Sequence, residues 1–124
     1  MTTGLLSGRW IGVYRYPGGG ANPVEEFTDT PLSVTLEDND GAVTGSCEEP
    51  DLPPPMGGTD LIYCRIEGEH SRGRIRFTKT PLNHPTLRPV VYEGEISRDG
   101  RRITGRWDLP DTWSGTFDLL RQEP

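Results

Sequence analysis

Residues 90–109 read VVYEGEISRDGRRITGRWDL, and this stretch contains the pattern that decides the fold. Apolar and polar side chains alternate on both sides of a turn, Arg98-Asp99-Gly100-Arg101, whose glycine favours a positive φ. Pairing the two flanks across that turn sorts the small and apolar side chains onto one face, with Ile96 opposite Ile103, Gly94 opposite Gly105 and Tyr92 opposite Trp107. Glu93 and Arg106 then meet on the other face. The stretch predicts an antiparallel hairpin with one apolar side.

The next turn along the chain, Pro110-Asp111-Thr112, extends this hairpin by a further strand. Pairing across it sets Trp107 against Gly115 and Gly105 against Phe117. Each aromatic ring then lies over a glycine that leaves room for it, which is typical of a strongly coiled sheet.

The same alternation with period two, interrupted by turn residues about every 8–12 positions, recurs along the whole chain. It predicts eight strands, and no segment has the period of a helix. The expected strands are Leu5–Tyr16, Phe27–Glu37, Ala42–Glu48, Leu61–Gly68, Arg74–Lys79, Val90–Ser97, Arg102–Leu109 and Thr112–Leu120.

Two further turns, Asp38-Asn39-Asp40-Gly41 and His70-Ser71-Arg72-Gly73, set the register of the earlier hairpins. Treated as four-residue turns, they predict inward pairs of Leu36 with Val43, Val34 with Gly45, Leu32 with Cys47, and Ile66 with Phe77. In the hairpin between them, which residues 49–60 close, Cys47 is expected opposite Cys64. We expect the side chain of His70, in the second of these turns, to be solvated.

Eight strands that share one apolar face can stack as a sandwich or close as a barrel. Closure removes the exposed edges. Glycines at the middle of several strands supply the bends that closure needs: Gly12, Gly45, Gly94, Gly105 and Gly115. We therefore expect an all-β fold, a single antiparallel eight-stranded up-and-down barrel that comprises residues 1–124 as one domain.

The composition and charge of the chain limit the kinds of partner that we expect. The chain has 124 residues and a net charge of −6, with no cluster of lysine or arginine, so a nucleic acid is not an expected partner. The first residues show neither a secretion signal nor a membrane span, and we expect a cytoplasmic protein without a membrane partner. The sequence does not indicate an oligomeric state.

The segment Leu6-Ser7-Gly8-Arg9-Trp10 resembles the Gly-x-Trp opening of the first strand in lipocalins and the wider calycin group. That resemblance implies a barrel, and it implies that Arg121 packs over Trp10. Residues 8–17, GRWIGVYRYP, also resemble the opening of the nitrobindin branch, whose barrels hold haem on a histidine late in the chain. Here the last histidine is His84, and we expect no cofactor.

The connections between the expected strands differ in length at the two ends of the barrel. Three long ones, residues 17–26, 49–60 and 80–88, gather with the short Pro110 turn at one end, while the other end has tight turns only. An open end of this kind is where an eight-stranded barrel binds a small ligand. The candidate lining is Tyr14, Tyr16, Leu32, Cys47, Cys64, Tyr92, Trp107 and Trp113, with His84 in a rim loop.

This lining favours a small apolar ligand held by one or two hydrogen bonds, and the competing interpretation is that the same rings fill the interior as core. An enzyme on the same scaffold, an isomerase or cyclase using Tyr14, Tyr92 or His84, is the alternative. A protein-interaction module that uses the Pro-rich Leu52–Met56 loop is another.

Candidate chemistry is sparse. Cys47 and Cys64 are expected to lie opposite each other on neighbouring strands, close enough for a disulfide bridge. In a cytoplasmic protein we expect two reduced thiols instead. Because no histidine or second cysteine pair is near, we expect no metal. Most acidic residues fall in turns or on the outer face, which leaves Lys79 as the main inward charge.

Overall fold

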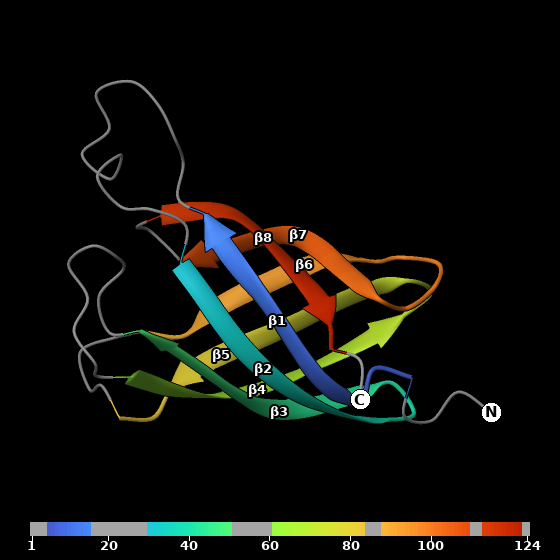
Figure 1. Cartoon of the computed structure of the whole chain (residues 1–124), viewed down its shortest axis with the longest axis horizontal. Coiled ribbons are helices and arrows are strands. Elements are labelled where there is room, and N and C mark those ends of the chain that lie inside the picture. Colours follow the sequence, from blue (N-terminus) through green and yellow to red (C-terminus); the bar gives the residue numbers. More distant parts are fainter. Residues whose placement is uncertain (1–4, 16–29, 51–60, 84–87, 110–112, 123–124) are drawn as a thin grey trace.

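Eight antiparallel strands close into one barrel in the computed structural model of the chain (Figure 1). The structure describes residues 5–15, 30–50, 61–83, 88–109 and 113–122. The strands are β1 (Gly8–Arg15), β2 (Thr30–Asn39), β3 (Ala42–Pro50), β4 (Leu61–Ser71), β5 (Arg74–Pro81), β6 (Val90–Ile96), β7 (Arg102–Leu109) and β8 (Trp113–Arg121). Each strand pairs with the next, and β8 pairs with β1. The expected fold, an up-and-down barrel and not a sandwich, is confirmed.

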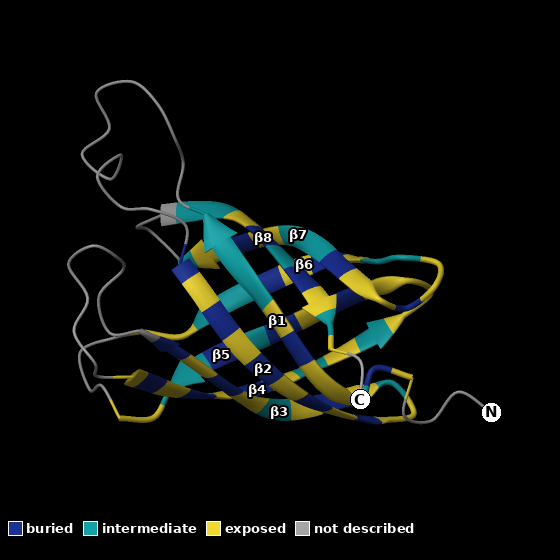
Figure 2. Cartoon of the chain, in the orientation of Figure 1, coloured by how far each residue is buried: buried dark blue, intermediate teal, exposed yellow. Residues whose placement is uncertain are grey.

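The strands alternate between an inward and an outward face, as Figure 2 shows in bands of buried and exposed residues. β2 is the clearest case, because every second residue from Thr30 to Asp38 is buried. The inner rings pack on one another: Phe77 stacks on Tyr92 with centroids 4.9 Å apart, and Phe117 meets Tyr92 edge-on at 4.9 Å. The middle of the barrel is therefore filled with side chains.

The register expected for the two C-terminal hairpins is confirmed. Tyr92 pairs with Trp107, and Trp107 pairs with Gly115. A Cβ atom at Gly115 would lie 2.7 Å from Nε1 of Trp107, so only glycine leaves room for this ring. The pairing of Cys47 with Cys64 is also confirmed.

The register expected for the two earlier hairpins is wrong by two residues. Leu36 pairs with Gly45 and not with Val43, Val34 pairs with Cys47 and not with Gly45, and Ile66 pairs with Lys79 and not with Phe77. Leu32, expected opposite Cys47, lies beyond the last β2–β3 pair.

The cause is the position of the turn, whose centre lies one residue further along the chain than expected in each hairpin. The loops are Asp40-Gly41, with φ of 59° and 103°, and Arg72-Gly73, with φ of 55° and 79°. Two consecutive positive φ values are typical of a type I′ turn, whose twist matches that of the flanking strands. A shift by two residues returns every side chain to the face it already had. The predicted inward set therefore holds although the partners change.

The N-terminal residues close one end of the barrel. The strand expected from Leu5 begins only at Gly8, because Leu5 and Leu6 form a turn that places Leu6 under the barrel, fully buried. Trp10 donates a hydrogen bond from Nε1 to the Leu6 carbonyl at 3.0 Å. The Arg121 guanidinium lies 5.2 Å from the centre of the Trp10 ring and donates to the carbonyls of Leu5 and Ser7. The contact between Arg121 and Trp10 that the lipocalin resemblance implies is present.

Asp38 and His70 join this closed end, which corrects two expectations. Asp38 was placed in a turn, yet it is a buried residue of β2, and its carboxylate accepts hydrogen bonds from the amides of Leu6 and Gly41. His70 is not solvated, because its Nε2 lies 2.7 Å from Oδ2 of Asp38. Burial alone would raise the pKa of Asp38, but these hydrogen bonds outweigh burial and hold the pKa below 3.8.

Candidate functional site

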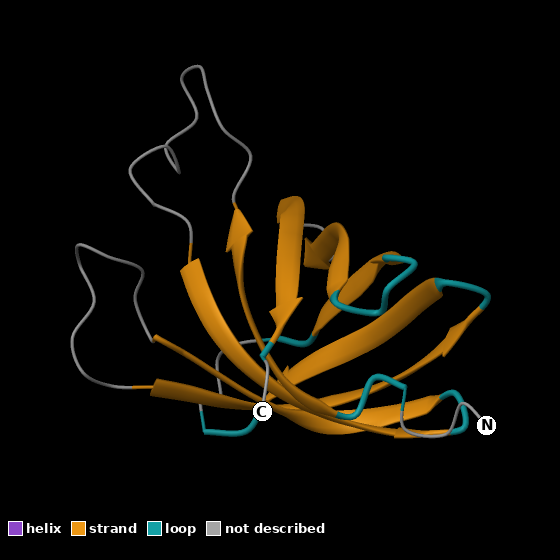
Figure 3. Ribbon diagram, turned by 45° about the vertical axis from the view of Figure 1, so that its right-hand side comes forward, coloured by secondary structure: helices purple, strands orange, loops and turns teal. Residues whose placement is uncertain are grey.

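The two ends of the barrel differ in how the strands are joined. At the closed end the connections are residues 40–41, 72–73 and 97–101, and at the other end they are residues 16–29, 51–60, 82–89 and 110–112. Figure 3 shows that the described chain consists of strands and loops alone. The strand ends that the longer connections join thus lie at one end of the barrel, as expected from the sequence.

A cavity of about 180 Å³ lies inside the barrel toward this open end. It is lined by Tyr14, Glu49, Ile62, Cys64, Lys79, Pro81, Arg88, Val90, Tyr92, Trp107 and Leu109. An apolar cavity of roughly 150 Å³ is enough to bind benzene. The space is therefore suited to a group of about one ring.

Three polar side chains meet in the wall of this cavity, and we call them the Tyr14–Glu49–Lys79 cluster. The ammonium of Lys79 forms a salt bridge with Oε1 of Glu49, and both side chains are almost fully buried. The hydroxyl of Tyr14 donates a hydrogen bond to Oε2 of Glu49 at 2.5 Å. Both oxygens of the carboxylate are thus engaged.

Aromatic rings surround the ammonium. Nζ of Lys79 lies 4.6 Å from the centre of the Tyr14 ring and 5.2 Å from that of Tyr92, within the range of a cation–π interaction. Burial alone would lower the pKa of Lys79, but the facing Tyr92, Glu49 and Tyr14 raise it well above 10.5. Burial also raises the pKa of Tyr92. At neutral pH the cavity wall therefore holds one ion pair beside a neutral phenol.

Glu49 is the residue of this cluster that sequence reasoning missed. The third strand was expected to end at Glu48, ahead of a loop with several prolines, whereas β3 continues to Pro50. The alternation itself contained the signal, because Cys47 points inward and Glu49 lies two residues further on the same strand. Lys79 was expected to point inward, and it does.

The structure brings four of the predicted lining residues to the cavity: Tyr14, Cys64, Tyr92 and Trp107. The other two that it describes, Leu32 and Cys47, are buried but do not line this cavity. Tyr16, His84 and the Leu52–Met56 loop lie outside the described residues. Trp113 begins β8 opposite Leu109, and its side chain is likewise outside the description.

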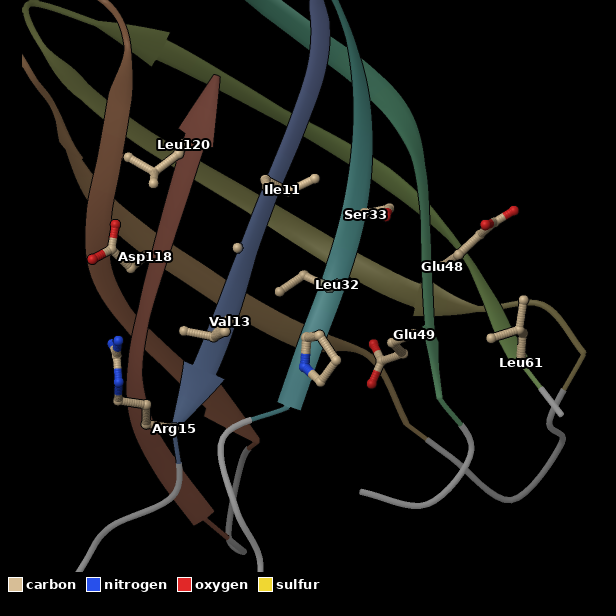
Figure 4. A pocket seen from close by; sticks show the side chains of 12 residues that line it. Ile11, Val13, Arg15, Leu32, Ser33, Glu48, Glu49, Leu61, Asp118 and Leu120 are labelled. Carbon is tan, nitrogen blue, oxygen red and sulfur yellow. The ribbon is translucent and has the colours of Figure 1, made fainter. Parts of the chain in front are cut away.

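A second hollow, a groove of about 600 Å³, lies on the outside of the barrel over β8, β1, β2 and β3 (Figure 4). Its apolar lining includes the exposed side chains of Ile11 and Leu120. The pairing of β2 with β3 ends at Ser33 and Glu48, and beyond that point the inward Glu49 also lines the groove. Glu49 thus borders both the groove and the interior cavity.

Cys47 and Cys64 complete the chemistry of the site. They are directly opposite on β3 and β4, both buried, and both are free thiols. Within the described ranges no group of three or more His, Cys, Asp or Glu side chains is placed to hold a metal ion. The described residues also include no helix that could cross a membrane.

Neither a scan against protein-family models nor a search of curated proteins finds a match to this chain.

Proposed function

We propose that this barrel binds a compact, largely apolar molecule of about one ring, which carries one hydroxyl or carbonyl group. The observation that carries the proposal is the buried Tyr14–Glu49–Lys79 cluster in the wall of a cavity that is otherwise lined mainly by apolar and aromatic side chains. Such a combination, an apolar pocket with a few fixed polar groups, is typical of small-molecule sites.

The charges of the cluster favour a neutral ligand. Glu49 and Lys79 balance each other, so a charged ligand would leave one charge uncompensated in a buried place. A hydroxyl or carbonyl group finds a donor in the Lys79 ammonium, which has three protons, whereas the single hydroxyl proton of Tyr14 is donated to Glu49. The rest of the ligand lies against Trp107, Val90 and Ile62.

The affiliation with the lipocalin-like barrels belongs to the same proposal. Its support is the closed antiparallel eight-stranded topology together with the Arg121 side chain packed on Trp10 at the closed end.

Ligand titrations followed by tryptophan fluorescence test the proposal. A Trp113→Phe variant leaves Trp107, which lines the cavity, and Trp10, which is buried at the closed end. We expect benzyl alcohol to change the Trp107 emission in a saturable way. We expect toluene, which lacks the hydroxyl, to bind about fivefold more weakly, because one net hydrogen bond contributes roughly 1 kcal/mol.

Two valine substitutions supply the matched control. Val90 lines the cavity, whereas its neighbour Val91 lies on the opposite face of β6. Val90→Phe fills the space and is expected to abolish binding, while Val91→Phe retains it. Equal binding by both variants, or no saturable binding of ring-sized alcohols to the wild type, contradicts the proposal.

Proton-transfer chemistry, as in an isomerase or cyclase, is the second candidate. The observation in its favour is that the Tyr14 hydroxyl and a buried carboxylate meet beside the cavity. Against it, the salt bridge and the hydrogen bond already engage both oxygens of Glu49, so neither oxygen faces a substrate without a protein partner.

Hydrogen–deuterium exchange next to a ketone separates the two candidates. If the cavity catalyses proton transfer, the wild type accelerates exchange at the α-carbon of cyclohexanone, followed by NMR, and Tyr14→Phe and Glu49→Gln lose the acceleration. If the barrel only binds, none of the three proteins exceeds the rate in buffer.

A further inference from the structure

Cys47 and Cys64 are placed for a covalent bond that the ligand-binding proposal does not use. They form one directly opposed pair of the β3–β4 ladder, and both side chains point into the barrel. Directly opposed residues of antiparallel strands have Cα atoms about 4.5–5.5 Å apart. A disulfide spans Cα separations of about 4.4–6.8 Å, so a bridge forms here without movement of the strands.

The two thiols differ in their access to the cavity. Cys64 lines the cavity, together with Lys79, and Cys47 does not. On the neighbouring strand β5, Pro81 lies directly opposite Cys64, and Lys79 lies diagonally to it, two residues along. The charge of the Lys79 ammonium favours the Cys64 thiolate over the thiol. Cys64 is therefore the one cysteine of the pair that faces both a cation and open space.

Small solutes can reach this space from the open end. Residues at its edge are partly or fully exposed, namely Arg88, Val90 and Leu109. Hydrogen peroxide is only slightly larger than water, and a cavity of about 180 Å³ has room for several water-sized molecules.

We propose that Cys64 is a peroxide-reactive thiol in the cavity wall, and that Cys47 resolves its oxidised form into a cross-strand disulfide. In the first step the Cys64 thiolate attacks a hydroperoxide, the O–O bond breaks, and Cys64 becomes a sulfenic acid while the peroxide leaves, with one proton, as an alcohol or water. In the second step the Cys47 sulfur attacks the Cys64 sulfur and water leaves. Two thiols and one hydroperoxide thus give one disulfide, one alcohol and one water, and an added dithiol reverses the oxidation.

The direct interaction between the two sulfur groups supports this division of roles. The hydrogen bond with Cys47 lowers the pKa of the Cys64 thiol and outweighs burial, which would raise it; Lys79 also lowers this pKa, and Glu49 opposes Lys79. The contact with Cys64, together with burial, raises the pKa of the Cys47 thiol. The attacking thiol is thus the more acidic one, and the resolving thiol stays protonated until the sulfenic acid forms.

Thiol counting and intact mass test the first claim. The reduced protein is treated with one equivalent of hydrogen peroxide, and thiols are counted after denaturation. We expect both thiols to disappear, with the loss of two hydrogen atoms in the intact mass, and dithiothreitol to restore both. Persistence of both thiols overturns the proposal.

Two serine variants test which cysteine reacts. Cys47→Ser is expected to stop at a sulfenic acid on Cys64, which dimedone traps. In Cys64→Ser the remaining Cys47 is expected to react at least about tenfold more slowly, because its thiolate fraction is lower. Circular dichroism verifies that each variant is folded. Equal rates, or faster trapping at Cys47, contradict the assignment.

These readouts need no bound ligand. The disulfide can therefore form in a barrel that binds no benzyl alcohol, and ligand binding can persist in the Cys47→Ser variant, because Cys47 does not line the cavity. The ligand titrations therefore decide only the binding proposal, and the thiol measurements decide only the oxidation proposal.

Discussion

At the scale of single residues, the buried salt bridge of Glu49 and Lys79 is the main departure from an apolar interior. Two buried charges lose their hydration. Their mutual attraction offsets this loss only while both charges are present. Removing one partner leaves a charge that has neither water nor a counter-ion. Such a pair is therefore a sensitive position for substitution.

We predict that Lys79→Met lowers the free energy of unfolding by about 3–5 kcal/mol, and that adding Glu49→Gln restores part of the loss because no unpaired carboxylate remains. Urea unfolding of the wild type, both single variants and the double variant measures this. Arg76 on the same strand supplies the control: its salt bridge with Glu93 is exposed, so Arg76→Met is expected to cost less than about 1 kcal/mol. Strict additivity of the two buried substitutions would contradict the prediction.

A second prediction at this scale concerns acid. The pKa of Asp38 is lower in the folded chain than its ordinary value of 3.8, so its contribution to stability is complete above that value and is lost as the pH falls through the folded pKa. Asp38→Asn removes this contribution and is expected to cost about 1–3 kcal/mol at pH 7. Below pH 3.8 the difference from the wild type should shrink.

Urea unfolding measured between pH 2 and pH 7 checks this prediction. The control is Asp108→Asn, which removes one negative charge, as Asp38→Asn does, but at an exposed residue. A difference between Asp38→Asn and the wild type that stays constant down to the lowest pH would show that the carboxylate charge has no part in the effect.

At the scale of strands and turns, alternation alone predicted all eight strands and the face of nearly every side chain. It did not predict the register of the β2–β3 and β4–β5 hairpins. Type I′ turns most often have Asn-Gly or Asp-Gly at their centre. Asp40-Gly41 has this composition, so the sequence contained a signal for the β2–β3 register, whereas Arg72-Gly73 does not have it. Placing each turn one residue too early kept the same residues inside, so the inward pattern was predictable, while the β4–β5 partners required the backbone dihedral angles.

Arg72 adopts a left-handed backbone conformation that costs most non-glycine residues energy. Asparagine tolerates this conformation better, and Asn-Gly is a preferred type I′ pair. We predict that Arg72→Asn raises the free energy of unfolding by about 0.5–1 kcal/mol. Thermal and urea unfolding measure the effect. Arg98→Asn, in a turn where only the glycine has a positive φ, is expected to change stability little, and a larger gain there would indicate an effect of charge instead.

At the scale of the whole molecule, the topology and the contrast between the two ends followed from the sequence, because turn residues and connection lengths are local signals. The site followed only in part. Alternation with period two places four of the predicted residues inside the barrel, where they line the cavity: Tyr14, Cys64, Tyr92 and Trp107. The partnership of Lys79 with Glu49 joins strands that are not neighbours in the sheet, and no local pattern specifies such a contact. The size of the cavity likewise depends on how the rings pack against one another.

The pairing of β8 with β1 has a further consequence for the covalent order of the chain. Arg121 lies opposite Trp10, and the Gln122 amide donates to the Arg9 carbonyl, so the last described strand ends beside the first. In a closed ring of strands, the hydrogen-bond pattern does not depend on which strand comes first in the sequence. A circular permutant that joins the two termini by a short flexible linker and opens between β1 and β2 should rebuild the same ladder of hydrogen bonds, with a far-ultraviolet circular dichroism spectrum like that of the parent chain.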